Sequence, residues 1–130
     1  MERSDMEALN DISGRIIRGA IEVHKQLGPG LLESTYEACL IHELVDSGLS
    51  VQSQVPFPVI YKGKSIDIGY RVDLLVEGMV VVELKSVERL LPIHSAQIIT
   101  YLKLSDLKVG LLINFNVHKI KDGVRRFINT

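Results

Sequence analysis

Apolar residues recur at spacings of three and four along the first part of the chain, which is the pattern of a helix with one buried face. The residues that set this pattern between positions 5 and 27 are Leu9, Ile12, Ile16, Ala20, Val23 and Leu27. The sequence Gly28-Pro29-Gly30 then ends the helix. A second helix is predicted over residues 31–47, and Gly48 follows as its stop.

After residue 50 the pattern changes to short apolar runs, which are typical of strands. The first run, Val51–Tyr61, contains Pro56 and Pro58. Proline cannot donate to a sheet ladder, so we predict an edge strand or an irregular one. Two further strands are predicted at residues 65–76 and 79–87, joined by a tight turn.

The last third of the chain adds a helix and further strands. Residues 92–104 form a third predicted helix, with Pro92 near its first turn. Residues 109–115, VGLLINF, are almost continuously apolar, as expected of an interior strand covered on both faces. Residues 117–127 are predicted to form a closing hairpin. The order α-α-β-β-β-α-β-β indicates an α/β (α+β) fold with a mixed sheet, in one domain over residues 1–130.

Composition narrows the class of protein. The chain has 130 residues, of which 46% are hydrophobic and 24% are charged, and this suits one compact domain. No apolar run reaches the roughly 18–20 residues of a membrane span, so no membrane partner is expected. The single cysteine, Cys39, fits a reducing, cytoplasmic location. The net charge of −1 gives no overall attraction for nucleic acid, and the four histidines lack the spacing of zinc ligands.

Three charged residues interrupt the apolar strands at 65–76 and 79–87, namely Asp73, Glu83 and Lys85. Burying an ionised group without a partner costs roughly several kcal/mol, so these charges should serve each other, a metal or a substrate. Side chains alternate along a strand, which places Glu83 and Lys85 on one face. A two-residue loop Glu77-Gly78 would place Asp73 on the opposite face from Glu83. We predict instead a three-residue loop at positions 76–78, which places Asp73 on the same face, diagonally adjacent to Glu83.

These groups can form a site for a divalent cation. Mg²⁺ takes oxygen ligands, and Asp73, Glu83 and the backbone carbonyl of Leu84 supply them, with Glu33 reaching the same metal through water. Lys85 would then orient a water for attack on phosphorus or stabilise the charge that develops on a phosphate.

Two glutamates at the start of the second predicted helix carry alternative interpretations. Glu33 near a helix N-terminus also stabilises the helix dipole, so a role in the dipole alone is the alternative to a ligand. Glu37 lies one turn later and is expected at the surface or beyond the ligands themselves.

His94, Gln97 and Tyr101 fall on one face of the helix predicted at 92–104. Gln97 can orient the nucleophile or a scissile phosphate, whereas a hydrogen bond between Gln97 and Tyr101 on a half-buried face is the structural alternative. His94 can touch a phosphate or cap the helix. Tyr36 is expected to be a core aromatic residue with a tethered hydroxyl.

Taken together, the residues resemble the PD-(D/E)XK nuclease superfamily. Asp73 followed by Glu83-Leu84-Lys85 matches its core signature, although Val72 stands where proline is expected. The run from Gln97 to Tyr101 is similar to the Gln-x-x-x-Tyr helix motif of many members.

A second set of residues resembles one branch of that superfamily. Gly30-Leu-Leu-Glu33-Ser-Thr-Tyr36 matches the motif of the small GxxExxY family, and GLLINFNV is similar to that family's last core strand. The resemblance spans roughly residues 16–115 and implies a restriction-endonuclease-like α-β-β-β-α-β core with helices on both faces of the sheet, and Mg²⁺ or Mn²⁺ at the site. The catalytic residues that it implies are Glu33, Asp73, Glu83, Lys85 and Gln97. The supporting residues are Tyr101, Tyr36 and His94.

The leading hypothesis is a metal-dependent nuclease, a Mg²⁺-dependent phosphodiesterase whose partner is nucleic acid, DNA ahead of RNA. The alternative is a catalytically idle nuclease-fold module that binds nucleic acid or a protein partner, or forms a homodimer. Near-neutral charge and an aromatic content of 5% favour this alternative. A third hypothesis is a structural domain in which the three strand charges form an ion-pair network. The basic residues Lys119, Lys121, Arg125 and Arg126 can track a nucleic-acid backbone or simply be solvated.

Overall fold

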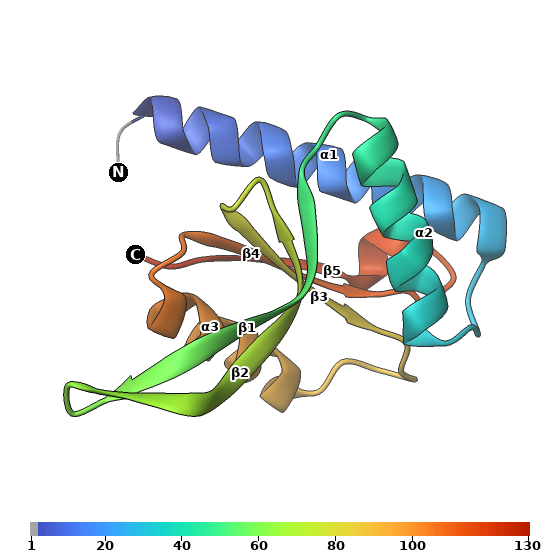
Figure 1. The fold of residues 1–130 in the computed structure, drawn as a ribbon. Helices are drawn as coiled ribbons and strands as arrows, with labels where there is room; N and C mark the ends of the chain where they lie inside the picture. The colour runs from blue at the N-terminus through green and yellow to red at the C-terminus, as the bar shows by residue number, and fades with distance from the viewer. Residues whose placement is uncertain (1–2) are drawn as a thin grey trace.

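The computed structural model describes residues 3–130, which form a five-stranded sheet and three α-helices (Figure 1). None of the helices in this range is both long and apolar enough to cross a membrane. The elements in chain order are α1 (Arg3–Leu27), α2 (Glu33–Asp46), β1 (Val51–Tyr61), β2 (Lys64–Val76), β3 (Val80–Lys85), α3 (Pro92–Ser105), β4 (Val109–Asn114), the 3₁₀ helix η1 (Ile120–Gly123) and β5 (Val124–Ile128).

The strands lie in the order β1-β2-β3-β4-β5. Among the strands of residues 3–130, only β3 and β4 run parallel, and α3 makes the crossover between them, because parallel neighbours cannot be joined by a tight turn. The other three neighbouring pairs are antiparallel. The predicted mixed sheet and α/β class are therefore confirmed.

Helices cover both faces of the sheet (Figure 1). On one face α1 and α2 pack on the even-numbered side chains of β3, such as Val82 and Leu84. On the other face Ile98 and Leu102 of α3 pack on Val81 and neighbouring residues. All six residues of β4 are buried, as predicted for an interior strand covered on both sides.

The closing hairpin predicted at residues 117–127 is wrong. The segment before β5 contains the 3₁₀ helix η1, and β5 pairs with β4 instead. The carbonyl of Val117 is bound by His24 Nε2 at 2.7 Å rather than by a strand. Ile120 is buried in the core, and Gly123 lies so close to Asn114 that an added Cβ would stand 2.1 Å from its carbonyl oxygen. These contacts fold the segment against the end of β4.

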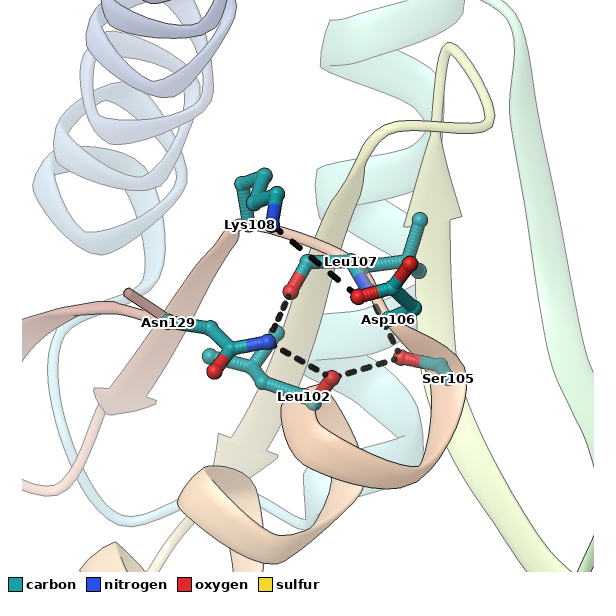
Figure 2. A network of polar contacts seen from close by, with 6 residues as sticks. All are labelled: Leu102, Ser105, Asp106, Leu107, Lys108 and Asn129. Atoms are coloured by element: carbon teal, nitrogen blue, oxygen red, sulfur yellow. Dashed lines mark hydrogen bonds and ion pairs between the residues drawn. The ribbon is translucent and has the colours of Figure 1, made fainter. Parts of the chain in front are cut away.

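The last residues of the chain fix the C-terminal end of α3 (Figure 2). Asp106 ends the helix in the left-handed conformation, with φ of 59°. The side-chain amide of Asn129 donates to the carbonyls of Leu102 and Leu107, both at 3.1 Å. Carbonyls at a helix end have no partner within the helix, so this contact satisfies one of them and ties α3 to the end of β5.

A close approach of α3 to β4 generates the first prediction. A Cβ added to Gly110 would lie 2.9 Å from Ile98 Cδ1 and 3.2 Å from Leu102 Cδ1. We expect Gly110→Val to lower the free energy of unfolding by about 1–3 kcal/mol, because overpacking forces side chains or the helix to move. Urea unfolding measures this change.

The double variant Gly110→Val with Ile98→Ala tests the cause. Removing the side chain that the new valine meets should make the combined loss smaller than the sum of the two single losses. Additive losses would contradict the close approach as the cause.

Candidate active site

The loop between β2 and β3 sets the positions of the three predicted charges. Val76 pairs with Val80, so the loop holds the three residues Glu77, Gly78 and Met79. The predicted odd loop length is confirmed, but the loop starts one residue later than predicted. Glu77 adopts φ of 54° and is held by hydrogen bonds in both directions with Ser50, which explains the shift. Extending the register places Asp73 directly opposite Glu83 rather than diagonally.

The ladder between β2 and β3 ends just before these two carboxylates. Leu74–Val82 is its last pair, although β2 continues along β1 and β3 continues along β4. Beyond it the backbone N–H of Asp73 donates to Glu83 Oε1 at 3.1 Å, and the N–H of Leu84 donates to Asp73 Oδ2 at 2.8 Å. Each carboxylate thus binds a backbone donor of the other strand at the point where the strands separate.

The environment of Glu83 raises its pKa to about 8. Burial is the largest cause, since the residue is only 5% exposed, and the charge of Asp73 is the second. Lys85 acts in the opposite direction but is the smallest contribution. In the absence of a metal, the protonated form of Glu83 is therefore favoured near neutral pH, as expected where two carboxyl groups occupy one site.

Lys85 is half-buried and points to the same face as Glu83 by strand alternation. Within residues 3–130 no ion pair of 4 Å or less joins it to Asp73 or Glu83. This argues against the ion-pair network of the third hypothesis. Lys85 thus lies two residues after Glu83 at the end of β3.

Asp73 also lines a hollow of about 200 Å³ together with Glu33, Ser34, Glu37, Gln54 and Leu84. Gln54 spans this hollow, because its side-chain nitrogen donates to Glu37 Oε1 at 2.8 Å and to Asp73 Oδ1 at 3.3 Å. Its backbone lies in the left-handed region, with φ of 53°, a conformation that costs of the order of 1 kcal/mol outside glycine.

Sequence reasoning missed Gln54, whereas the position of Glu37, linked to Asp73 only through Gln54, agrees with the expectation that it lies beyond the ligands themselves. Gln54 lies in a polar stretch of an edge strand, where nothing in the sequence marks its unusual φ. Glu37 lines the hollow rather than the outer surface, and Gln54 links it to Asp73. Glu33 is exposed at the first residue of α2 and lines the same hollow, so its dipole role and its role towards a ligand are compatible.

The oxygen atoms at the point where β2 and β3 separate suit a divalent cation. In a strand, the N–H and C=O of one residue point to the same side, so the Leu84 carbonyl faces β2, where its N–H meets Asp73. The carbonyl of Lys85 faces the other way and accepts the N–H of Phe115 at 3.0 Å. Among the described residues no three acidic, histidine or cysteine side chains gather closely enough to hold a metal by themselves. Asp73, Glu83 and the Leu84 carbonyl would therefore need water or substrate oxygens to complete a coordination shell.

The helix α3 brings Tyr101 near the two carboxylates. Burial raises the pKa of Tyr101 most, the charge of Glu83 raises it further, and a hydrogen bond from Gln97 lowers it. This interaction agrees with the structural alternative for Gln97, and a role of Gln97 towards a substrate stays a prediction. The Tyr101 ring stacks on Tyr70 at 4.4 Å, and Tyr70 stacks on Phe57 at 5.4 Å.

His94 caps α3. The imidazole Nδ1 of His94 accepts a hydrogen bond from the backbone N–H of Leu91 at 3.0 Å, and the backbone N–H of His94 donates to the Leu91 carbonyl at 3.0 Å. Of the two roles considered for His94, capping is the one that these contacts support.

Tyr36 is a fully buried aromatic residue with a tethered hydroxyl, as expected. The hydroxyl donates to the Gly28 carbonyl at 2.6 Å and accepts the N–H of Leu31 at 3.1 Å, while the ring stacks on Phe115 at 4.5 Å. These contacts hold the loop that leads into Glu33.

The basic residues near the C-terminus do not form one patch. Arg125 donates to Ser95 of α3, whereas Arg126 donates to Asn10 of α1 on the other side of the sheet. A single basic surface tracking nucleic acid is not supported here.

The raised pKa of Glu83 predicts a pH dependence of stability. A group whose pKa is higher in the folded state than its ordinary value of 4.5 stabilises the fold at low pH, and this contribution is lost as pH rises to about 8. Each pH unit in that window removes up to about 1.4 kcal/mol. Glu83→Gln cannot ionise, so its stability should fall less than that of the wild type between pH 5 and 9.

Urea unfolding of the metal-free protein across this range measures the difference. The exposed Glu88→Gln variant serves as the matched control. Parallel pH profiles for wild type and Glu83→Gln would show that Glu83 titrates in its ordinary range.

Comparison with known proteins was made by family model and by direct search. Searches of curated proteins and of solved structures found no match. The family model described as "PD-(D/E)XK nuclease superfamily" matches residues 10–127, a range that contains the carboxylate pair, Lys85 and all three helices in whole or in part. Val72, at the position where the superfamily signature has proline, is fully buried against the α3 side of the sheet. The chain belongs to the PD-(D/E)XK nuclease superfamily.

Proposed function

We propose that the protein is a metal-dependent nuclease that hydrolyses phosphodiester bonds of nucleic acid at the end of the β2–β3 ladder. The observation that carries this proposal is geometric. Asp73 and Glu83 meet where the two strands separate, Lys85 follows Glu83 on the same face of β3, and Asp73 lines the hollow beside α2. Membership of a nuclease superfamily supports the same conclusion.

The metal would be held by Asp73, Glu83 and the Leu84 carbonyl, with Glu33 reaching it through water. Mg²⁺ or Mn²⁺ fits these oxygen donors. When bound, such a cation supplies Lewis acidity to phosphate oxygens and lowers the pKa of coordinated water. Within the chain, Lys85 orients the attacking water and offsets negative charge that develops on the phosphate.

The remaining side chains act by position. Gln97 orients the nucleophile or the scissile phosphate, and Tyr101 supports Gln97 through the hydrogen bond between them. Gln54 holds Asp73 in place from the side of α2 and connects it with Glu37. Among the acidic residues of α2, we therefore assign Glu37 the stronger influence on Asp73.

We also propose that the chain belongs to the GxxExxY branch. Each residue of that motif has a clear structural position. Gly30 has φ of 97°, which favours glycine, Glu33 lines the hollow, and Tyr36 fastens the loop between them. The motif would thus place an acidic side chain over the carboxylate pair.

One observation favours a protein partner or homodimer, as in the idle-module alternative. The outer surface of α3 and its approach carries exposed apolar side chains, with Leu91 43%, Ile93 66%, Ile99 41% and Leu104 46% exposed. A helix that is apolar on several sides is normally covered. A partner on this surface is compatible with catalysis as well as with its absence.

Lys85→Ala tests the mechanism. We expect metal-dependent cutting by the wild type and a loss of about 10²–10³-fold in rate for the variant, since a positioned cation is removed from the transition state. The assay presents linear, single-stranded and branched DNA and RNA with Mg²⁺, Mn²⁺ or EDTA.

Lys103→Ala, which removes an exposed lysine near the end of α3, is the matched control and should cut like the wild type. An unchanged rate for Lys85→Ala would rule out this mechanism. A wild type that binds nucleic acid and metal but cuts none of these substrates would favour the idle module.

A comparison of Glu37→Gln with Glu33→Gln tests the two acidic residues of α2. Glu37 is coupled to Asp73 through Gln54, whereas Glu33 has no such link among the described hydrogen bonds. We expect Glu37→Gln to weaken Mn²⁺ binding, measured by calorimetry, more than Glu33→Gln does. The reverse order would show that the water-mediated contact of Glu33 contributes more to metal binding than the link from Glu37 through Gln54.

A further inference from the structure

The outer half of the β1–β2 hairpin projects from the body of the protein (Figure 1). Every residue from 60 to 69 is exposed, on both strands and on both faces. A two-stranded ribbon by itself is at best marginally stable in water. This segment, residues 58–69, is called the ribbon below.

The ribbon exposes apolar side chains that a surface hairpin does not need. Ile60 and Tyr61 are each 60% exposed, Ile66 is 36% exposed, and Ile68 is 90% exposed. Single exposed apolar residues are ordinary, but a cluster on one projecting element marks a contact surface.

A bulge presents the most exposed of these side chains. Phe57 pairs with Tyr70 and Val59 pairs with Ile66, so residues 67–69 bulge opposite Pro58. The backbone is so close here that a Cβ on Gly69 would lie 2.0 Å from the Phe57 carbonyl oxygen. Bulges of this kind redirect side chains, and Ile68 stands at the centre of this one.

The charge of the ribbon is opposite to that of the whole chain. The ribbon carries the two cations Lys62 and Lys64 and one acid, Asp67, in a protein whose net charge is −1, and Arg71 follows two residues beyond its end. Lys62 and Gly63 form the tip, with φ of 50° and 79°. The ribbon therefore offers an exposed cationic end.

The base of the ribbon leads directly to the candidate active site. Tyr70 stacks on Tyr101 at 4.4 Å, and Asp73 follows three residues later on the same strand. A polymer that lies along the ribbon would pass the carboxylate pair.

We propose that the ribbon enters the major groove of double-stranded DNA and so positions the duplex at the Asp73–Glu83 site. This inference rests on the proposed nuclease function and names its substrate class. The major groove of B-DNA is about 12 Å wide and admits a two-stranded β-ribbon, whereas the deep, narrow major groove of duplex RNA does not. Lys62 and Lys64 contact phosphates, and Ile68 packs on the apolar edges of bases, such as thymine methyl groups.

Fluorescence anisotropy with EDTA, which prevents cutting, tests the binding. The probes are a DNA duplex, an RNA duplex and a single strand of equal length. We expect preference for the DNA duplex, and we expect the charge reversal Lys62→Glu with Lys64→Glu to weaken that binding about tenfold or more and to lower the salt slope by about 2. Ile68→Ser should weaken it several-fold without changing the salt slope.

The matched control is Lys119→Glu with Lys121→Glu, which reverses two exposed lysines far along the chain, next to β5. It should leave duplex affinity within about twofold of the wild type, since a surface charge away from the contact adds only a screened, long-range effect. Equal losses for both double variants, or wild-type binding by the ribbon variants, would overturn the inference. Equal affinity for duplex RNA would overturn the groove assignment.

Two further measurements separate this inference from the proposed function. Hydrolysis of bis(p-nitrophenyl) phosphate with Mn²⁺ needs the site but not the ribbon, so the ribbon variants should retain wild-type rates. If the wild type does not hydrolyse this ester but binds the DNA duplex through the ribbon, the nuclease proposal is wrong and the ribbon contact is retained. Sedimentation that shows a dimer dissolved by Ile68→Ser, with DNA binding unchanged, would make the ribbon a protein interface and overturn the inference.

Discussion

The candidate site depends on one exchange of hydrogen bonds between β2 and β3. Where the ladder ends, Asp73 binds the N–H of Leu84 and Glu83 binds the N–H of Asp73. Each buried backbone donor is satisfied by a carboxyl oxygen, so the strands can separate without leaving donors unpaired. The same exchange brings two acidic groups together, and the charge of Asp73 adds to the larger effect of burial in raising the pKa of Glu83.

Elements on both faces of the sheet pack near the point where β2 and β3 separate. On one side Tyr36 fastens the loop before α2, which brings the start of α2 over Asp73. On the other side the absence of a side chain at Gly110 lets α3 approach β4, and Tyr101 on α3 lies within electrostatic reach of Glu83. The packing at Tyr36 and Gly110, away from the carboxylates, therefore determines which polar side chains of α2 and α3 lie near Asp73 and Glu83.

Much of this arrangement could be predicted from the sequence, for identifiable reasons. The spacing of hydrophobic residues predicts the apolar strands. The alternation of side chains along a strand predicts the odd number of residues in the β2–β3 loop and the common face of Glu83 and Lys85. The exact start of the loop was mispredicted, since it depends on the long-range contact between Glu77 and Ser50. Gln54 was missed for a similar reason, because a left-handed glutamine on an edge strand leaves no periodic signal. The false hairpin at 117–127 came from treating a 3₁₀ segment, buried by tertiary contacts, as a strand.

The departures from regular sheet geometry are not scattered. The interior strands β3 and β4 keep a continuous parallel register from Val80 to Lys85, whereas β1 and β2 contain the left-handed Gln54 and the bulge opposite Pro58. Conformations of this kind cost free energy, so they persist only where surrounding contacts impose them. Here one of them aims a side chain at Asp73 and the other projects Ile68 into solvent. A regular pair of strands thus carries Glu83 and Lys85, while an irregular pair carries Asp73 and the proposed substrate surface. Local regularity gives way on the strands that we propose face the substrate, which is where a functional site is expected to override local preference.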